Sequence, residues 1–255
     1  MLLAFDIGNT NVTIGVFDGE QLRATWRMAT DVHKMADEYA ALLMNMLPHE
    51  NIGTKDITDI CICNVVPPLT TTFLELAQRY FNITPVVVGV GVKSGVKIRM
   101  DNPREVGADR IADAAAAHHL YGGPLIIIDL GTATTFSIVS KEGDFIGGII
   151  ATGIATAAEA LYTRTAQLPR VDLVHPKTVI GTNTVSAIQS GVIYGYASLV
   201  EGMIARINKE LGEKTKVVAT GGYSALIAKE TKAIDEVNPD LTLVGLRLIY
   251  EMNRG

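Results

Sequence analysis

The chain has 255 residues, a formal net charge of −5 at pH 7 and a pI near 5.6, and 48% of its residues are hydrophobic. This length allows one large domain or two small ones, and the aliphatic content is enough for two cores. The acidic balance and the scattered basic residues exclude non-specific binding to nucleic acid or to an anionic membrane surface, both of which need a basic face. We therefore expect small-molecule partners, with no nucleic acid and no membrane.

The sequence predicts a cytoplasmic protein. Asp6 interrupts the first apolar run almost at once, and no basic segment precedes it, so the N-terminus does not read as a signal peptide. Cys61 and Cys63 are two positions apart in "DICICNVV", a spacing that does not favour a mutual disulfide on a strand. Buried free thiols in a reducing compartment are the better interpretation.

The first half reads as strands followed by alternating helices and strands. The predicted elements are strands at 2–6, 12–17 and 22–28 with a hairpin at Asp18-Gly19, a helix at 36–47 ended by Pro48, the strand "ITDICICNV", the helix "PLTTTFLELAQRYF", the strand "TPVVVGV", and an alanine-rich helix within 102–121 with Pro103 near its start and Gly122 past its end. The glycine-rich "GVGVKSG" at 89–95 lacks dinucleotide-binding spacing and is expected to be a loop.

The second half repeats this plan. The predicted elements are a strand ending at Asp129, a hairpin of "TTFSIVS" and "FIGGII", the helix "TAAEALY", a long helix at 184–211, the strand "KVVAT", a helix after Gly222 and a last helix at 241–252. The repetition predicts two similar α/β domains, residues 1–120 and 121–255. We expect an actin/hexokinase-like (ribonuclease H-like) fold in which the domains share a nucleotide cleft.

Two similar turns begin the two halves, "DIGNTN" at 6–11 and "DLGTAT" at 129–134. Gly8 and Gly131 allow the backbone to approach a ligand closely, and the neighbouring hydroxyl and amide groups can hold phosphate oxygens. Asp6 and Asp129 would repel phosphate unless a cation lay between them, most simply Mg²⁺. No P-loop lysine motif is present.

Other patterns leave alternatives open. One aspartate turn alone is ordinary turn chemistry, and the turn at 220–222 is either an adenine-binding segment or a plain strand-to-helix connection. Asp109 beside Arg110 is either a base next to an arginine that holds an anionic substrate group, or an exposed helical ion pair. Asp101, Glu105 and Asp113 lie nearby, so position alone does not single out Asp109.

Taken together, these segments resemble the type III pantothenate kinase family over essentially the whole chain. The matching segments, in order, are DIGNTN at 6–11, DNPREVGADR at 101–110, DLGTATTF at 129–136, RTAQLPRV at 164–171, GTNT at 181–184 and ATGG at 219–222. The resemblance implies ATP-dependent phosphorylation of pantothenate to 4′-phosphopantothenate, the first step of coenzyme A biosynthesis. It also implies a homodimer, Mg²⁺ with ATP, and a monovalent cation, K⁺ or NH₄⁺.

The resemblance also assigns residues to roles. ATP would be bound by Asp6, Ile7, Gly8, Asn9, Thr10, Asn11, Val12, Thr13 and Thr132. Pantothenate would be bound by Met100, Gly107, Ala108, Asp109, Arg110 and Thr184, with Asp109 as the base and Thr184 acting across the dimer interface. Asp129 would hold the monovalent cation, and Asp6 would hold Mg²⁺ through the phosphates. This assignment replaces the shared Mg²⁺ that the turns alone suggested.

Three positions depart from the family pattern. Met100 stands where a tyrosine is usual, Ser137 replaces a common aspartate, and Thr152 replaces the proline of "APG". None removes a proposed catalytic group, so we expect an active kinase with altered substrate affinity. The competing hypotheses are a sugar kinase or polyphosphate phosphatase of the same fold, a non-catalytic regulatory protein, and an actin-like filament protein.

Overall fold

The computed structural model describes residues 1–254, which form two compact units. The first unit contains Met1–Lys97, Asp101–Ala116 and the chain from Leu241 onward, and the second contains Ile98–Met100 and Ala117–Asp240. The units therefore differ from a simple division at residue 120. The residues from Leu241 onward belong to the first unit because the apolar side of the last helix packs into a core that also holds Leu2 and Ala4.

A five-stranded sheet forms the centre of the first unit, in the order β3-β2-β1-β4-β5. Its strands are β1 (Leu2–Ile7), β2 (Asn11–Asp18), β3 (Gln21–Ala29), β4 (Asp59–Asn64) and β5 (Val86–Val87). β1, β2 and β3 are successively antiparallel, whereas β4 and β5 run parallel to β1. Since β1 and β4 are parallel, their carboxyl ends lie at the same edge of the sheet.

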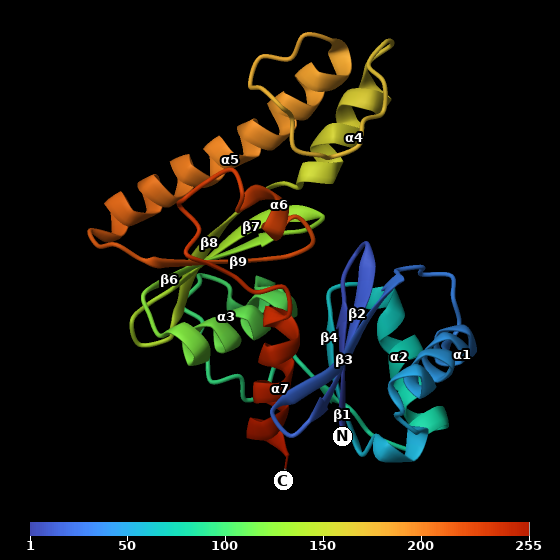
Figure 1. Cartoon of the computed structure of the whole chain (residues 1–255). Helices are drawn as coiled ribbons and strands as arrows, with labels where there is room; N and C mark the ends of the chain where they lie inside the picture. Colours follow the sequence, from blue (N-terminus) through green and yellow to red (C-terminus); the bar gives the residue numbers. More distant parts are fainter. Residues whose placement is uncertain (255) are drawn as a thin grey trace. The chain divides into compact units, whose positions relative to one another are not determined.

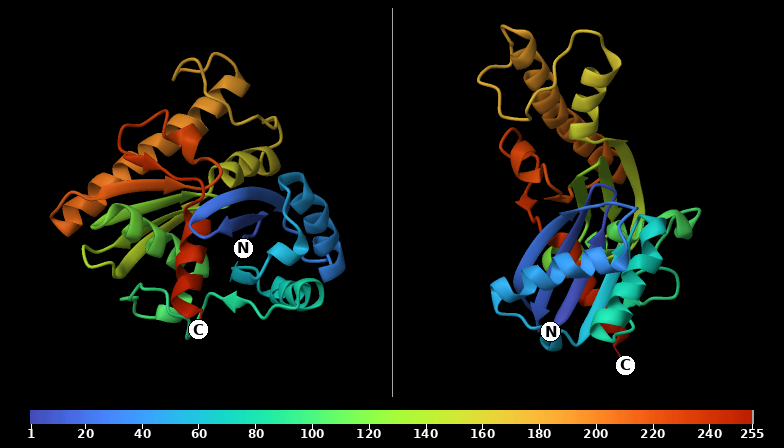
Figure 2. Two further views of the ribbon diagram at one scale, coloured as in Figure 1. Left: turned by 60° about the horizontal axis from the view of Figure 1, so that its bottom comes forward. Right: turned by 90° about the vertical axis from the view of Figure 1, so that its right-hand side faces the viewer.

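Helices cover both faces of this first sheet (Figure 1 and Figure 2). They are α1 (Ala36–Met46), α2 (Thr70–Leu76), α7 (Leu241–Asn253) and the first part of α3 (Ala108–Tyr121). The α1 and α2 face holds Phe5, Tyr39 and Phe73, whose rings contact one another in the larger core. The opposite face packs against α3 and α7. Alternate residues of β1 therefore contribute to two different cores.

The second unit repeats the sheet pattern of the first, with the order β10-β9-β6-β7-β8. Its strands are β6 (Leu125–Leu130), β7 (Ala133–Val139), β8 (Phe145–Thr152), β9 (Lys216–Thr220) and β10 (Glu236–Val237). β6, β7 and β8 are successively antiparallel, and β9 and β10 run parallel to β6. The equivalence of β6 to β1 confirms the predicted repetition of two similar α/β folds.

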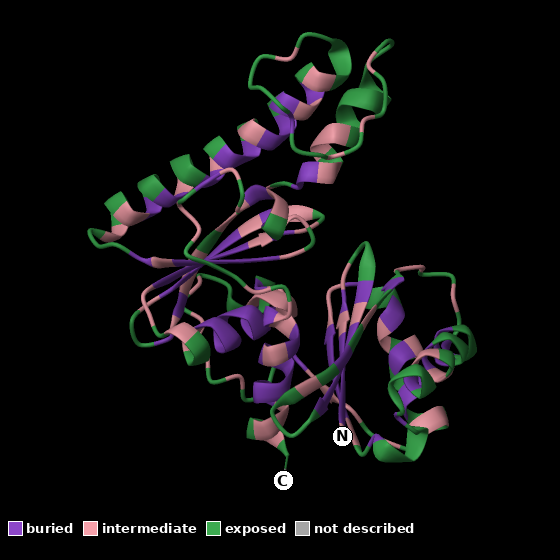
Figure 3. Cartoon of the chain, in the orientation of Figure 1, coloured by how far each residue is buried: buried purple, intermediate pink, exposed green. Residues whose placement is uncertain are grey.

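Three helices belong wholly to the second unit: α4 (Ile154–Arg164), α5 (Thr184–Leu211) and α6 (Ser224–Ile227). Asn183 caps α5 by accepting a hydrogen bond from the Ser186 amide, and Gly212 ends it in the left-handed region. The buried positions of α5 recur every three or four residues and form the stripe seen in Figure 3. The periodicity in the sequence thus gave both ends of this helix correctly.

One predicted helix was wrong at its start, and one short strand was not predicted. The helix predicted within 102–121 begins only at Ala108, because Pro103–Glu105 form a separate 3₁₀ turn and Val106 is extended, and it ends at Tyr121, before Gly122, as predicted. The predicted helix after Gly222 is present as α6, with four residues, whereas the short edge strand β10 was not predicted. None of the helices within residues 1–254 is both long and apolar enough to cross a membrane.

Candidate active site

The first aspartate turn connects β1 to β2 and is closed by backbone hydrogen bonds. The Gly8 amide donates to the Asn11 carbonyl at 3.0 Å, and the Thr30 hydroxyl donates to the Gly8 carbonyl at 2.6 Å. A β-carbon on Gly8 would lie 3.1 Å from the Asn11 carbonyl oxygen, so glycine allows this tight closure. The side chains of Asn9, Thr10 and Asn11 are exposed at the turn. This is the kind of polar turn that phosphate binding requires.

Two of the predicted ATP contacts lie in the core rather than at the turn surface. Ile7 and Val12 are fully buried and pack among the apolar side chains beneath α1 and α2. Their side chains therefore hold the turn in place, and only their backbone groups remain for a ligand. Thr30 was not predicted from the sequence, because nothing in the order of residues places the end of β3 beside Gly8.

Asp6 shares one face of the first sheet with two neighbours across the strands. It is paired with Thr13 on β2 and with Cys63 on β4. Directly paired residues project to the same face of a sheet, and here it is the face that packs against α3 and α7. Because α3 carries Asp109 in its first turn, the two predicted carboxylates belong to the same side of the first unit.

Asp109 is held in an unusual setting for a carboxylate. Burial raises its pKa above the ordinary value of 3.8, while the Arg110 amide and guanidinium partly oppose that rise. The Arg110 amide donates to Oδ1 of Asp109 at 2.7 Å. A β-carbon on Gly107 would overlap the same oxygen, so glycine leaves room for the carboxylate at the start of α3. A carboxylate with a raised pKa at a helix start is suited to accept a proton.

The electrostatics of Cys63 identify which acidic side chains lie near that thiol, which is paired with Asp6 across the strands. Burial raises the pKa of the Cys63 thiol well above 9.0, and the charges of Asp6, Asp109 and Asp113 raise it further. Asp101 and Glu105 are exposed instead, and Glu105 accepts a hydrogen bond from Asn102. The structure therefore separates acidic residues that the sequence alone left equivalent.

Asp113 has a partner of its own in the same unit. Its Oδ1 accepts a hydrogen bond from the Thr242 hydroxyl of α7 at 2.7 Å, and the residue is almost completely buried. Both cysteine side chains are shielded from solvent. Burial raises the pKa of Cys61 to about 12, as it raises that of Cys63, so both thiols are unreactive. Both cysteines are free and buried, which confirms that part of the sequence analysis.

The second aspartate turn follows β6 and is enclosed by glycines. Asp129 is paired with Thr135 on β7 and with Thr220 on β9. A β-carbon on Gly131 would lie 3.3 Å from Oδ1 of Asp129, and one on Gly221 would overlap that oxygen and lie 2.7 Å from the Leu130 amide nitrogen. Gly221 also has a φ of +87°, which favours glycine. The third glycine-containing turn predicted from sequence therefore packs directly against the second aspartate turn.

Thr132 is exposed on this turn, and its carbonyl accepts a hydrogen bond from Thr156 of α4 at 3.1 Å. Gly153, just before α4, approaches the Gly131 and Thr132 carbonyls so closely that a β-carbon would overlap both. This contact was not predicted from the sequence.

The predicted pantothenate residues are divided between the units. Gly107 to Arg110 belong to the first unit, whereas Met100 and Thr184 belong to the second. Met100 is half-buried just after a bridge between Ile98 and Phe145, and Thr184 is exposed as the first residue of α5.

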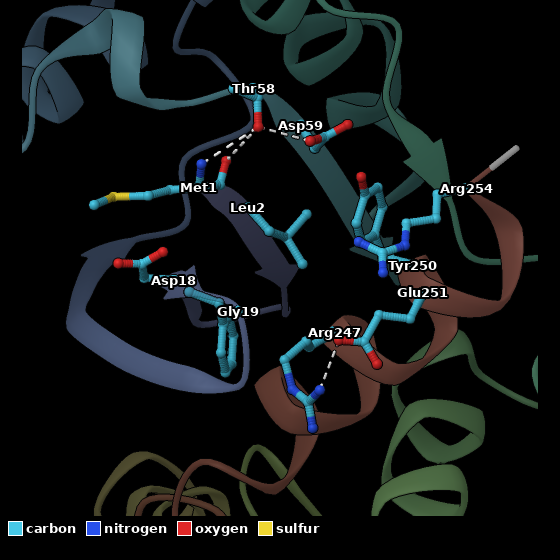
Figure 4. A pocket seen from close by; sticks show the side chains of 11 residues that line it. Met1, Leu2, Asp18, Gly19, Thr58, Asp59, Arg247, Tyr250, Glu251 and Arg254 are labelled. Carbon is cyan, nitrogen blue, oxygen red and sulfur yellow. Dashed lines mark hydrogen bonds and ion pairs between the residues drawn. The ribbon is translucent and has the colours of Figure 1, made fainter.

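A separate cavity of about 140 Å³ lies at the opposite end of the first sheet (Figure 4). It is lined by the start of β1, the residues at the start of β4, the hairpin at Gly19 and the last turns of α7. None of the predicted site residues lines it. Arg247, which is almost fully buried there, pairs with Glu251 at 2.7 Å, while its Nε has no hydrogen-bond partner within residues 1–254.

Comparison with known proteins identifies the family. The family model for type III pantothenate kinase matches residues 2–206. A type III pantothenate kinase from Dehalococcoides mccartyi strain CBDB1 is 58% identical over 253 residues, covering 99% of this chain and 96% of the relative. The same enzyme from strain BAV1 is 57% identical with the same coverage. The chain belongs to the type III pantothenate kinase family. Membership of this family confirms the prediction that the chain is a kinase.

Solved structures agree with the fold of this type III pantothenate kinase family member. An inorganic polyphosphate/ATP-glucomannokinase from Arthrobacter sp. strain KM has a TM-score of 0.52 at 14% identity, covering 99% of both chains. The activator of 2-hydroxyisocaproyl-CoA dehydratase from Clostridium difficile, solved with bound ADPNP, has a TM-score of 0.57 at 12% identity, covering 99% of this chain and 94% of that one. These likenesses confirm the predicted actin/hexokinase-like fold.

Proposed function

We propose that this chain transfers the γ-phosphoryl group of ATP to the primary hydroxyl of pantothenate, with Asp109 as the base. The observation that carries the proposal is the setting of Asp109 on α3, on the same face of the sheet as Asp6, with a raised pKa. Family membership supplies the substrates. Because ATP is the donor and both thiols are free, we also propose a cytoplasmic location.

Phosphoryl transfer depends mainly on positioning and charge neutralisation. Asp109 accepts the hydroxyl proton as the oxygen attacks phosphorus, and the Arg110 guanidinium, beside it in sequence, holds an anionic group of the substrate. The turn from Asp6 to Thr13 contributes backbone amides and the exposed side chains of Asn9, Thr10 and Asn11 to the phosphates. Thr132 adds a further contact to ATP.

Two cations are part of the proposal. No group of three or more potential ligands is present within residues 1–254, which fits a Mg²⁺ that is held largely by phosphates and water beside Asp6. Asp129, crowded by Gly131 and Gly221, fits a single oxygen ligand of K⁺ or NH₄⁺ at the end of β6. Bound cations would neutralise phosphate charge near the two carboxylates.

The experiment that tests this function measures ADP release from MgATP with and without pantothenate, in K⁺ buffer and again in Na⁺ buffer. We expect release only when both pantothenate and K⁺ are present. Pantothenate-dependent ADP release in both buffers would support the kinase activity but contradict the proposal that Asp129 holds a K⁺ ion needed for activity. Release with glucose or mannose but not pantothenate, from folded protein, would replace the proposed substrate.

We also propose that the second unit forms a homodimer. Between residues 150 and 185 the surface exposes seven large apolar side chains, contributed by Ile150, Leu161, Tyr162, Val174, Val179, Ile180 and Val185. They come from β8, α4, the following loop and the start of α5, and α4 and α5 contact each other. Such a concentration is unusual on a monomer surface and typical of a subunit interface. Thr184 lies beside Val185, where a residue can contribute to the partner's site.

Sedimentation of Ile180→Asp tests the interface, because Ile180 is 80% exposed and a buried charge there would disrupt the dimer. Val90→Asp is the matched control, since Val90 is 81% exposed on a loop of the first unit. We expect a monomer only for Ile180→Asp. Mixing inactive Asp109→Asn with inactive Thr184→Val then tests shared sites, because a mixed dimer would regain one intact site and measurable activity.

A further inference from the structure

Arg99 and Asp144 form an ion pair that joins the segment Ile98 to Met100 to the hairpin between β7 and β8. Nε of Arg99 donates to Oδ2 of Asp144, and the Arg99 amide donates to the Phe145 carbonyl at 2.8 Å. Ile98 forms a parallel bridge with Phe145. All of these contacts lie within the second unit.

The acceptor side of this contact is held by hydrogen bonds within its own hairpin. Asp144 closes the hairpin between β7 and β8, where the Ser140 amide donates to its carbonyl at 2.8 Å and its own amide donates to the Ser140 hydroxyl at 3.2 Å. Its side chain is 15% exposed, so the pair is partly protected from solvent, whereas the Arg99 side chain is 55% exposed. A fixed, partly buried carboxylate can hold a more mobile guanidinium in one place.

Only three residues attach here, Ile98 to Met100, and the chain on both sides belongs to the first unit. The attachment therefore sets where Met100, a predicted pantothenate contact, lies within the second unit. We propose that Arg99 is a positioning residue for pantothenate, acting through its ion pair with Asp144 and not by touching the substrate. This inference rests on the proposed function.

The kinetic test compares Arg99→Ala, Asp144→Ala and the double variant. We expect each single change to raise the KM for pantothenate about two- to fivefold, as suits a partly exposed ion pair, with kcat and the KM for ATP unchanged. The double variant should be no worse than either single one, because both remove the same interaction. Equal KM values in wild type and Arg99→Ala, or additive effects in the double variant, would overturn the proposal.

Two further variants separate positioning from general damage. Exchanging the charges, Arg99→Asp together with Asp144→Arg, should restore the KM that Arg99→Asp alone raises. Arg23→Ala is the matched control, because it breaks the exposed pair with Asp18 in another hairpin and should leave the KM for pantothenate unchanged. A KM for ATP that rises in parallel with that for pantothenate would indicate a structural role and reject the inference.

Amide hydrogen exchange distinguishes failure of this inference from failure of the proposed function. If wild-type protein releases no ADP with pantothenate, the proposed function is wrong. In that case exchange at residues 100–107 still reports on positioning, and we expect it to be faster in Arg99→Ala than in wild type. Unchanged exchange there would overturn the inference whatever the activity.

Discussion

Gly107 and Asp109 are so close that a β-carbon on the glycine would overlap Oδ1 of the aspartate. The same oxygen accepts a hydrogen bond from the Arg110 amide. The carboxylate is thus confined on one side by the backbone before α3 and on the other by the first turn of that helix. This confinement fixes the group proposed to take the proton from pantothenate.

Gly107→Ala should displace the Asp109 carboxylate without unfolding the protein. We expect kcat to fall roughly tenfold to a hundredfold, because small displacements of a reacting group are costly. The free energy of unfolding should change by less than about 1 kcal/mol, since Gly107 does not require a positive φ. Gly89→Ala is the control, because a β-carbon there meets nothing within 4 Å. Normal turnover of Gly107→Ala would contradict the assigned carboxylate position.

Asp109→Asn removes the proposed base while retaining its shape. Turnover should fall by about 100-fold to 10,000-fold, the range for loss of general base catalysis. ATP affinity, measured by calorimetry, should stay near the wild-type value. Asp101→Asn is the matched control, because Asp101 is an exposed carboxylate in the same segment and should retain activity. Near-normal turnover of Asp109→Asn would reject the base assignment.

The raised pKa of Asp109 predicts a pH dependence of activity and of stability. The base must be deprotonated, so kcat should decrease at acid pH with an apparent pKa above the ordinary 3.8. The folded state holds this proton more tightly than the unfolded state, so the contribution of Asp109 to stability decreases as pH rises above 3.8. Asp109→Asn should therefore be more stable than wild type at neutral pH. Urea denaturation at pH 7 and pH 5 checks whether that advantage shrinks on acidification.

Gly221→Ala should disturb the turn that encloses Asp129. The positive φ of Gly221 costs an alanine about 1–2 kcal/mol, and the added carbon would overlap Oδ1 of Asp129. We expect a lower free energy of unfolding and a weaker response of activity to K⁺. Gly222→Ala is the matched control, since the adjacent glycine has open space around its α-carbon. Equal K⁺ activation in both variants would argue against a cation at Asp129.

Glu251→Ala should destabilise the first unit beside the cavity of Figure 4. The change leaves the buried Arg247 guanidinium without its carboxylate, which costs about 1–3 kcal/mol of unfolding free energy. Glu75→Ala breaks the exposed pair with Arg79 at the same helical spacing and should cost no more than about 0.5 kcal/mol. Thermal or urea denaturation compares the two. Equal losses would show that burial of Arg247 has no energetic consequence.

The sequence by itself determined the elements whose signals are local. The apolar period of α5 and its flanking Asn183 and Gly212 define both ends of the helix, and the paired aspartate turns predicted two similar sheets. The six motifs in order were sufficient to indicate the family. The helix containing Asp109 was misjudged at its start, because alanine-rich periodicity does not show that Val106 is extended.

Only the tertiary structure decided which acidic side chains are shielded from solvent and which glycines leave room for a neighbouring carboxylate. Asp101 and Asp109 look alike in sequence, but packing of α3 on the sheet partly buries Asp109, whereas Asp101 is exposed. The approach of Gly221 to Asp129 joins residues ninety-two positions apart, and the contact of Arg99 with Asp144 joins residues 45 positions apart. Such contacts depend on how strands pair across the sheet and at its edge, which the order of residues along one strand does not encode.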